Sequence, residues 1–115
     1  MNWYLAKLIF DIDTGASASK AQFDEQLRLV NAVSETDAYF KAKELGRKNQ
    51  SEFLNEKTET VAWRFVGVSE VVQLNEIKDG VELYSTTLET NEKENFINSV
   101  LQKGIAIQSK NLLFC

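Results

Sequence analysis

Four carboxylates near the start of the chain are the residues whose types and spacing could do chemistry. Asp11 and Asp13 close the first apolar segment, and Asp24 and Glu25 open the next one, across a short polar loop. If the two segments pair as a hairpin, these side chains approach one another and could bind a hard cation or exchange a proton. No metal-loop spacing surrounds them, so the pattern favours solvated acids at strand ends and no bound metal.

Glu25 differs from its neighbours because it falls on the apolar side of its segment, beside Phe23 and Leu27. A carboxylate in that position has to be paired, exposed at a strand end, or functional. Arg64, which alternates with apolar residues of a later segment, and Lys7 are its candidate partners. A structural ion pair is favoured over catalysis, and we name no catalytic residue.

A second group of polar residues lies in the segment 81–89, where Glu82 and Tyr84 share the less apolar face. If Glu25 and Arg64 converge with them, the four side chains could line a pocket for a small ligand or a carboxylate-based reaction. The chain has no histidine, no glycine-rich phosphate loop and no nucleophile elbow, so we expect no cofactor and do not favour an enzyme.

The two tryptophans mark apolar strand faces that need a cover. Trp3 shares a face with Leu5 and Ile9, and Trp63 shares one with Phe65. If two helices cover one side of a sheet, the other side stays apolar and a partner, a ligand or the C-terminal tail must cover it. A homodimer or the docked tail is favoured over a ligand pocket lined by Trp63, Phe65 and Tyr84. The candidate ligand or interface residues are therefore Trp3, Lys7, Glu25, Trp63, Arg64, Phe65, Glu82 and Tyr84.

Length and composition limit the class of protein. A chain of 115 residues fits a single domain, 1–115, with enough buried surface for a core. Its net charge of −4 argues against nucleic acid as a partner, and its opening apolar run is too short for a membrane span and lacks the basic start of a signal peptide. The one cysteine, Cys115, excludes an internal disulfide. We expect a cytoplasmic protein that binds no membrane.

The periodicity of apolar residues predicts the elements that position these side chains. Strands are expected over 3–12, 21–33, 60–68 with a continuation through 69–74 after a bulge near 67–69, and 81–89. Ser34 begins the first helix, and Thr90 or Asn91 begins a second that runs to about Gln102 and ends at Gly104. The region 49–59 is expected to be a turn. The apolar tail, 105–115, is expected to dock on the rest of the chain, and one interpretation makes it a further strand. A constant offset of 56 residues between the halves suggests a duplication, although it inverts the strand faces near Trp63.

These elements predict an α+β fold of order ββαββα with a docked tail. We expect a mostly antiparallel sheet of four or more strands, the first and third central, with two helices on one face.

Several stretches resemble a known family, the bacterial domain of unknown function 4288. They are WYLAKLIF at 3–10, FDEQLRLVNA at 23–32, AKELG at 42–46, FLNEKTETVAWRFVGV at 53–68 and DGVELYS at 79–85. The resemblance covers roughly residues 3–89. It implies a stand-alone bacterial cytoplasmic protein and carries over no activity or catalytic residue. The matching positions to inspect first are Glu25, Gln26, Trp63, Glu82 and Tyr84.

Three functions stay open at this point. The first is a non-enzymatic binding module that forms a homodimer through an apolar sheet face, or binds another protein. The second is a small-ligand binder or carboxylate enzyme using Glu25, Arg64, Glu82 and Tyr84. The third is an immunity-type protein that masks a bacterial toxin, which the small size and acidity permit.

Overall fold

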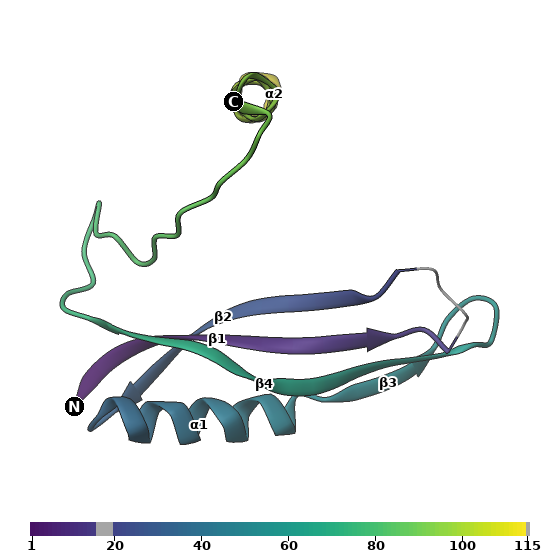
Figure 1. The fold of residues 1–115 in the computed structure, drawn as a ribbon, viewed down its shortest axis with the longest axis vertical. Helices are drawn as coiled ribbons and strands as arrows, with labels where there is room; N and C mark the ends of the chain where they lie inside the picture. The colour runs from purple at the N-terminus through teal and green to yellow at the C-terminus, as the bar shows by residue number, and fades with distance from the viewer. Residues whose placement is uncertain (16–19, 115) are drawn as a thin grey trace. The chain divides into compact units, whose positions relative to one another are not determined.

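The chain forms an antiparallel sheet of four strands and two helices in the computed structural model, which describes residues 1–15 and 20–114. It divides into two compact units, Met1–Tyr84 and Ser85–Cys115, and each is described by itself. The element order ββαββα of an α+β fold is confirmed (Figure 1). The elements are β1 Asn2–Asp13, β2 Gln22–Ala32, α1 Glu35–Lys48, β3 Ser51–Leu54, β4 Thr60–Leu74 and α2 Lys93–Phe114.

The first unit is built around β1, which pairs on both of its edges. The strand order is β2-β1-β4-β3 and every pair is antiparallel, so β1 and β4 are central, as the sequence predicts. The β1–β2 ladder keeps one register throughout, with Tyr4 opposite Val30. The β1–β4 ladder shifts twice, between Lys7 and Leu8 and between Ile9 and Phe10. The predicted bulge near 67–69 therefore exists and has a second irregularity beside it.

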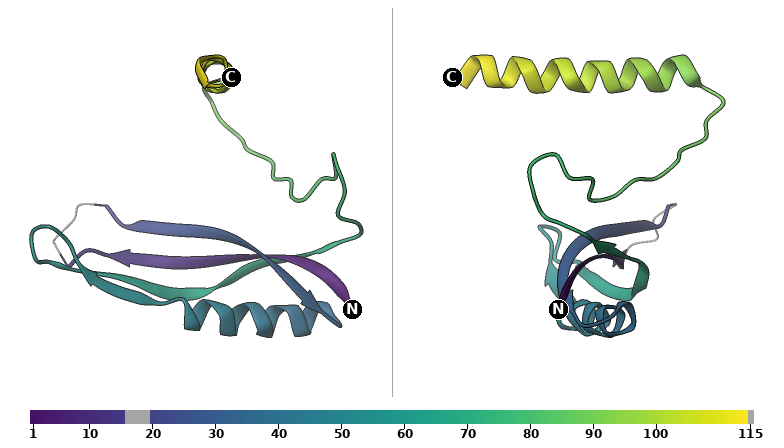
Figure 2. Two further views of the ribbon diagram at one scale, coloured as in Figure 1. Left: turned by 180° about the vertical axis from the view of Figure 1, so that it is seen from behind. Right: turned by 90° about the vertical axis from the view of Figure 1, so that its left-hand side faces the viewer.

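Helix α1 lies along one face of the sheet, which curls toward it when seen end on (Figure 2). The helix begins where the Ser34 Oγ accepts a hydrogen bond of 3.1 Å from the Asp37 backbone N–H. Its inner residues Ala38 and Ala42 are fully buried with the even-numbered residues of β1. The core consists of Tyr4, Ala6, Leu8, Phe10, Val30, Ala32, Ala38 and Ala42.

Gly46 explains how the helix sits so close to the sheet. A Cβ at this position would overlap the Phe65 Cε1, so the aromatic ring occupies the space that any other side chain would need. The same ring packs against Phe10, with 5.6 Å between the ring centroids. Glycine inside a helix normally lowers its stability, and at Gly46 the structure gives it a packing role.

Two predicted elements and the predicted duplication differ from the structure. Residues 81–89 form no strand and pair with none of the four strands, which shows that a β-rich composition does not by itself bring a segment into the sheet. The fourth strand is instead β3, inside the region predicted as a turn. The duplication fails with the strand at 81–89, since β2 then has no counterpart in the second half.

Helix α2 is longer than predicted and belongs to the second unit. It continues through Gly104 to Phe114, so the tail is helical and not a strand. Glycine inside a helix costs about 1 kcal/mol, yet the helix continues beyond Gly104 through Ile105 and Ile107. Within the described residues, no helix combines the length and hydropathy that a membrane crossing requires.

Replacing Gly46 by alanine should destabilise the first unit. The new Cβ would displace the Phe65 ring, and overpacking of this kind costs about 1–3 kcal/mol, which outweighs the gain in helix propensity. Urea denaturation followed by circular dichroism measures the loss. Gly104→Ala is the matched control, because a Cβ there meets nothing within 4 Å. Equal stability of Gly46→Ala and the parent protein would contradict the packing role.

Candidate functional site

The face of the sheet turned away from α1, here called the open face, carries the odd-numbered residues of β1. Its members on the neighbouring strands follow from the register, since Leu27 lies opposite Lys7 and Val72 lies opposite Leu5. Five large apolar side chains on it are 40–57% exposed. These residues form the open-face patch: Trp3, Phe23, Leu27, Leu29 and Val72.

Lys7 stands at the centre of the open face with a side chain only 17% exposed. Its Nζ donates a hydrogen bond of 2.8 Å to the Tyr84 hydroxyl and lies 4.6 Å from the centre of that ring. The Glu70 carboxylate on β4 is 3.9 Å from the same nitrogen. The segment after β4 therefore returns to the open face and is fastened there through one lysine.

The surroundings of Lys7 raise its pKa above the ordinary lysine value. The hydrogen bond to Tyr84 is the largest cause, and the negative charges of Glu70 and Glu25 add to it, while partial desolvation acts in the opposite direction. Because folding raises this pKa, the contact stabilises the fold at every pH below the ordinary lysine pKa. The contribution is lost as the pH rises through the raised value.

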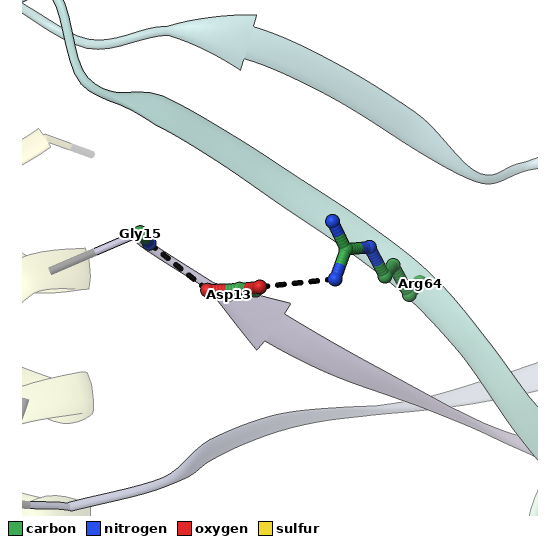
Figure 3. A network of polar contacts seen from close by, with 3 residues as sticks. All are labelled: Asp13, Gly15 and Arg64. Carbon is green, nitrogen blue, oxygen red and sulfur yellow. Dashed lines mark hydrogen bonds and ion pairs between the residues drawn. The ribbon is translucent and has the colours of Figure 1, made fainter. Parts of the chain in front are cut away.

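The structure brings only some of the predicted site residues together. Glu25 lies diagonally from Lys7 on the open face and acts on its charge, as expected for one of the two partners named. Arg64 instead pairs with Asp13, with 3.0 Å between its Nη1 and the Asp13 Oδ2, at the loop end of the strands (Figure 3). Glu82 is exposed and makes no side-chain hydrogen bond or ion pair in the described part of the chain. The predicted pocket of Glu25, Arg64, Glu82 and Tyr84 is not assembled.

Trp63 and Phe65 face the other way. Phe65 lies opposite Phe10 and packs against the core, and Trp63 stacks on Phe53 with 5.8 Å between the ring centroids. The Trp63 Nε1 donates a hydrogen bond of 3.2 Å to the Asp24 carboxylate. Since Tyr84 contacts the open face, no pocket is shared by Trp63, Phe65 and Tyr84.

The four carboxylates near the start of the chain, Asp11, Asp13, Asp24 and Glu25, divide between the two faces of the sheet. Asp24 belongs to the α1 side with Trp63, while Asp13 accepts hydrogen bonds from Arg64 and from the Gly15 backbone N–H at 2.9 Å (Figure 3). The alternation of side chains along β2 separates Asp24 from Glu25. Among the described residues, no three carboxylates or thiols converge in a way that could hold a metal ion.

Two features escaped the sequence analysis. Glu70 lies opposite Lys7 because of the register between β1 and β4. A register shifted by two residues would give Lys7 a different neighbour, and no local sequence pattern specifies this register. On the α1 side, Arg28 donates to the Gln26 side-chain oxygen at 2.7 Å, and Gln26 donates to Asp24 at 2.7 Å. The alternation of polar residues at 24, 26 and 28 was the signal for this row.

A shallow hollow of about 490 Å³ runs along the free edge of β2. Its lining combines apolar surface from Trp3, Leu29 and Leu45 with the charged side chains Lys41, Glu44 and Lys48 of α1. Lys41 donates a hydrogen bond of 2.7 Å to the Asn31 backbone carbonyl at one end of this edge. Apolar walls with charges at the rim suit contact with another polypeptide better than a chemical reaction.

Tyr84→Phe should lower the pKa of Lys7 toward its ordinary value, because it removes the largest cause of the increase. A titration of the Lys7 side chain by NMR measures the change, and Glu70→Gln should lower the pKa by less. Glu82→Gln is the matched control in the same segment and should leave it unchanged. The same Lys7 pKa in Tyr84→Phe and the parent would show that the contact is absent in solution.

Comparison with known proteins gives a family and nothing beyond it. No curated protein and no solved structure matches the chain. One family model matches residues 3–85 and is described as a domain of unknown function. The match spans β1 to the Tyr84 contact, and so it contains the whole sheet, α1 and the Lys7 cluster. Because it covers well over half of the chain, the protein belongs to this family, DUF4288, as the resemblance of the quoted stretches indicated.

Proposed function

We propose that the protein is a non-enzymatic interaction module that binds a second copy of itself through the open face. The observation that carries this proposal is the open-face patch, five large apolar side chains from three adjacent strands that are 40–57% exposed. Contiguous apolar surface of this kind is typical of protein–protein contact sites. Trp3 supplies an aromatic anchor of the type that dominates interface energies.

A second copy suits this face because charges of both signs lie inside it. A two-fold axis brings the same patch of both copies together, so a self-complementary surface needs a cation near an anion. Lys7 meets this need with Glu70 at 3.9 Å and Glu25 beside it. Apolar residues around these charges exclude water and strengthen ion pairs between the copies.

The ligand-binding and enzymatic alternative has less support. Of its four residues, Arg64 is held by Asp13 and Glu82 is exposed. The immunity-type alternative requires a partner other than a second copy, and no contact of the open face specifies one: its central cation, Lys7, is already matched by Glu70 and Glu25 of the same chain. We therefore retain self-association as the function.

We further propose that the module acts in a bacterial cytoplasm. A single cysteine in the chain suits a reducing compartment, and the family resemblance described above implies a bacterial source. The sheet of the first unit is held by backbone pairing and apolar packing and uses no disulfide, so a reducing compartment leaves it intact.

Trp3→Ala should weaken self-association by about tenfold or more, since buried tryptophans are frequent hot spots of interfaces. Sedimentation velocity on serial dilution measures the dimer dissociation constant, and circular dichroism checks the fold. Phe40→Ala is the matched control, because Phe40 is 58% exposed on α1, the helix that lies on the opposite face of the sheet. A parent protein that stays monomeric at high concentration, or a Trp3→Ala variant that associates like the parent, would overturn the proposal.

A further inference from the structure

The sheet of the first unit has two outer edges, and they differ in regularity. On β4, β3 pairs only with Thr60–Trp63, and the Gln50 side chain accepts the next outward hydrogen bond from the Phe65 N–H at 2.9 Å. The rest of β4 is irregular, with two register shifts against β1. β2 shows no shift from Gln22 to Ala32. Bulges protect a sheet edge from further pairing, and a long regular edge invites it.

Lys41 marks where the free part of the β2 edge ends. It donates a hydrogen bond to the Asn31 carbonyl, so this carbonyl points away from β1 and is already occupied. The N–H and C=O of one residue point to the same side of a strand, and this side alternates along the chain. Therefore the backbone groups of residues 23, 25, 27 and 29 also point outward. The free stretch of β2 is 22–30, and its midpoint is Gln26.

We propose that β2 pairs antiparallel with β2 of a second copy about a two-fold axis at Gln26. This register overlaps the free stretch 22–30 with its whole length in the partner. Outward backbone groups then meet outward groups, because residue 23 lies opposite 29 and residue 25 opposite 27. The two sheets become one continuous sheet, with both α1 helices on one face and both open faces on the other.

Side-chain complementarity selects this register among those that the backbone allows. Asp24 of each copy lies opposite Arg28 of the other, which gives two ion pairs on the α1 side, and Phe23 lies opposite Leu29 on the open face. An axis at Leu27 places Asp24 opposite Val30, and an axis at Arg28 places two arginines together. An axis at Glu25 places two glutamates together, and like charges directly opposite each other destabilise a strand pair.

The hollow along β2 supports the same arrangement. Leu29 lines it together with Trp3 and Leu45. In the proposed register Phe23 of the second copy lies beside Leu29, where it can cover apolar surface that is otherwise exposed to water. This inference goes beyond the proposed function because it uses the backbone of one edge, and either contact can exist without the other.

A cysteine introduced in place of Gln26 tests the register directly. Gln26 would face its own copy in a non-hydrogen-bonded pair, where the Cα atoms are about 4.5 Å apart, within disulfide range. In a Cys115→Ser background, Gln26→Cys should give a disulfide-linked dimer on mild oxidation, visible on a non-reducing gel. Contact through the open faces cannot produce this dimer, because Gln26 belongs to the α1 side. Gln22→Cys is the matched control and should not cross-link, because Gln22 is exposed on the same α1 side but lies opposite Val30 of the other copy, far from its own counterpart.

Charge reversal provides a second test that needs no disulfide. Arg28→Asp should weaken the β2 contact by about tenfold, since two attractive pairs become repulsive, and adding Asp24→Arg should restore it. Sedimentation velocity in a Val72→Asp background follows the edge contact alone, because the new charge disrupts the open face on β4 and leaves the β2 edge unchanged. Cross-linking of Gln22→Cys as fast as that of Gln26→Cys, equal association of Arg28→Asp and its parent, or failure of the double variant to recover would each overturn the inference. These outcomes leave the open-face proposal standing.

Discussion

The fold depends on how closely α1 approaches the sheet. Ala38, Ala42 and Gly46 recur at intervals of four residues and form a ridge of small residues along the inner side of the helix. Large residues of the sheet fill the space that this ridge leaves, above all Phe65 at Gly46. Ridges at this spacing let a helix pack at short range with little void. Once the helix is seated, the side of every strand that faces it is fixed.

The packing of α1 on one side of the sheet creates the open face on the other. Because side chains alternate along a strand, burying Tyr4, Ala6, Leu8 and Phe10 under α1 forces the odd-numbered residues of β1 outward. A sheet covered on both faces could hide them, but the first unit contributes one helix and the Tyr84 contact. The position of Lys7 is part of the same constraint. A cation in the middle of that face requires neighbours of opposite charge, and Glu70 and Glu25 supply them.

Elements were predicted correctly from the sequence where the apolar periodicity extends over many residues. Side-chain contacts were predicted poorly where they depend on the register between strands. The alternation in 3–12 and 21–33 and the Ser34 cap identified β1, β2 and α1, including the central place of β1. The pairing of Arg64 with Asp13 depends on two bulges whose position adjusts the partners of β4 along β1. The segment 81–89 shows a different limit, because strand propensity does not by itself pair a segment, even though β4 keeps an unpaired edge beyond β3. Its one anchored residue, Tyr84, uses a side chain in place of the backbone.

The regular outer edge of β2 contrasts with the irregular outer edge of β4, and this difference indicates which edge can pair with another strand. Both β2 and β4 have one edge that is unpaired over most of its length. Only β4 carries bulges, and only on β4 does a glutamine side chain accept a hydrogen bond from an outward N–H. Natural sheets that remain single molecules protect both edges, since a free edge is a template for another strand. On β2 the protection is limited to Lys41 at Asn31, and the residues before it alternate acidic, neutral and basic side chains at 24, 26 and 28. A row of this kind is its own complement when reversed about its middle residue, which is the symmetry that an antiparallel pair of identical strands requires.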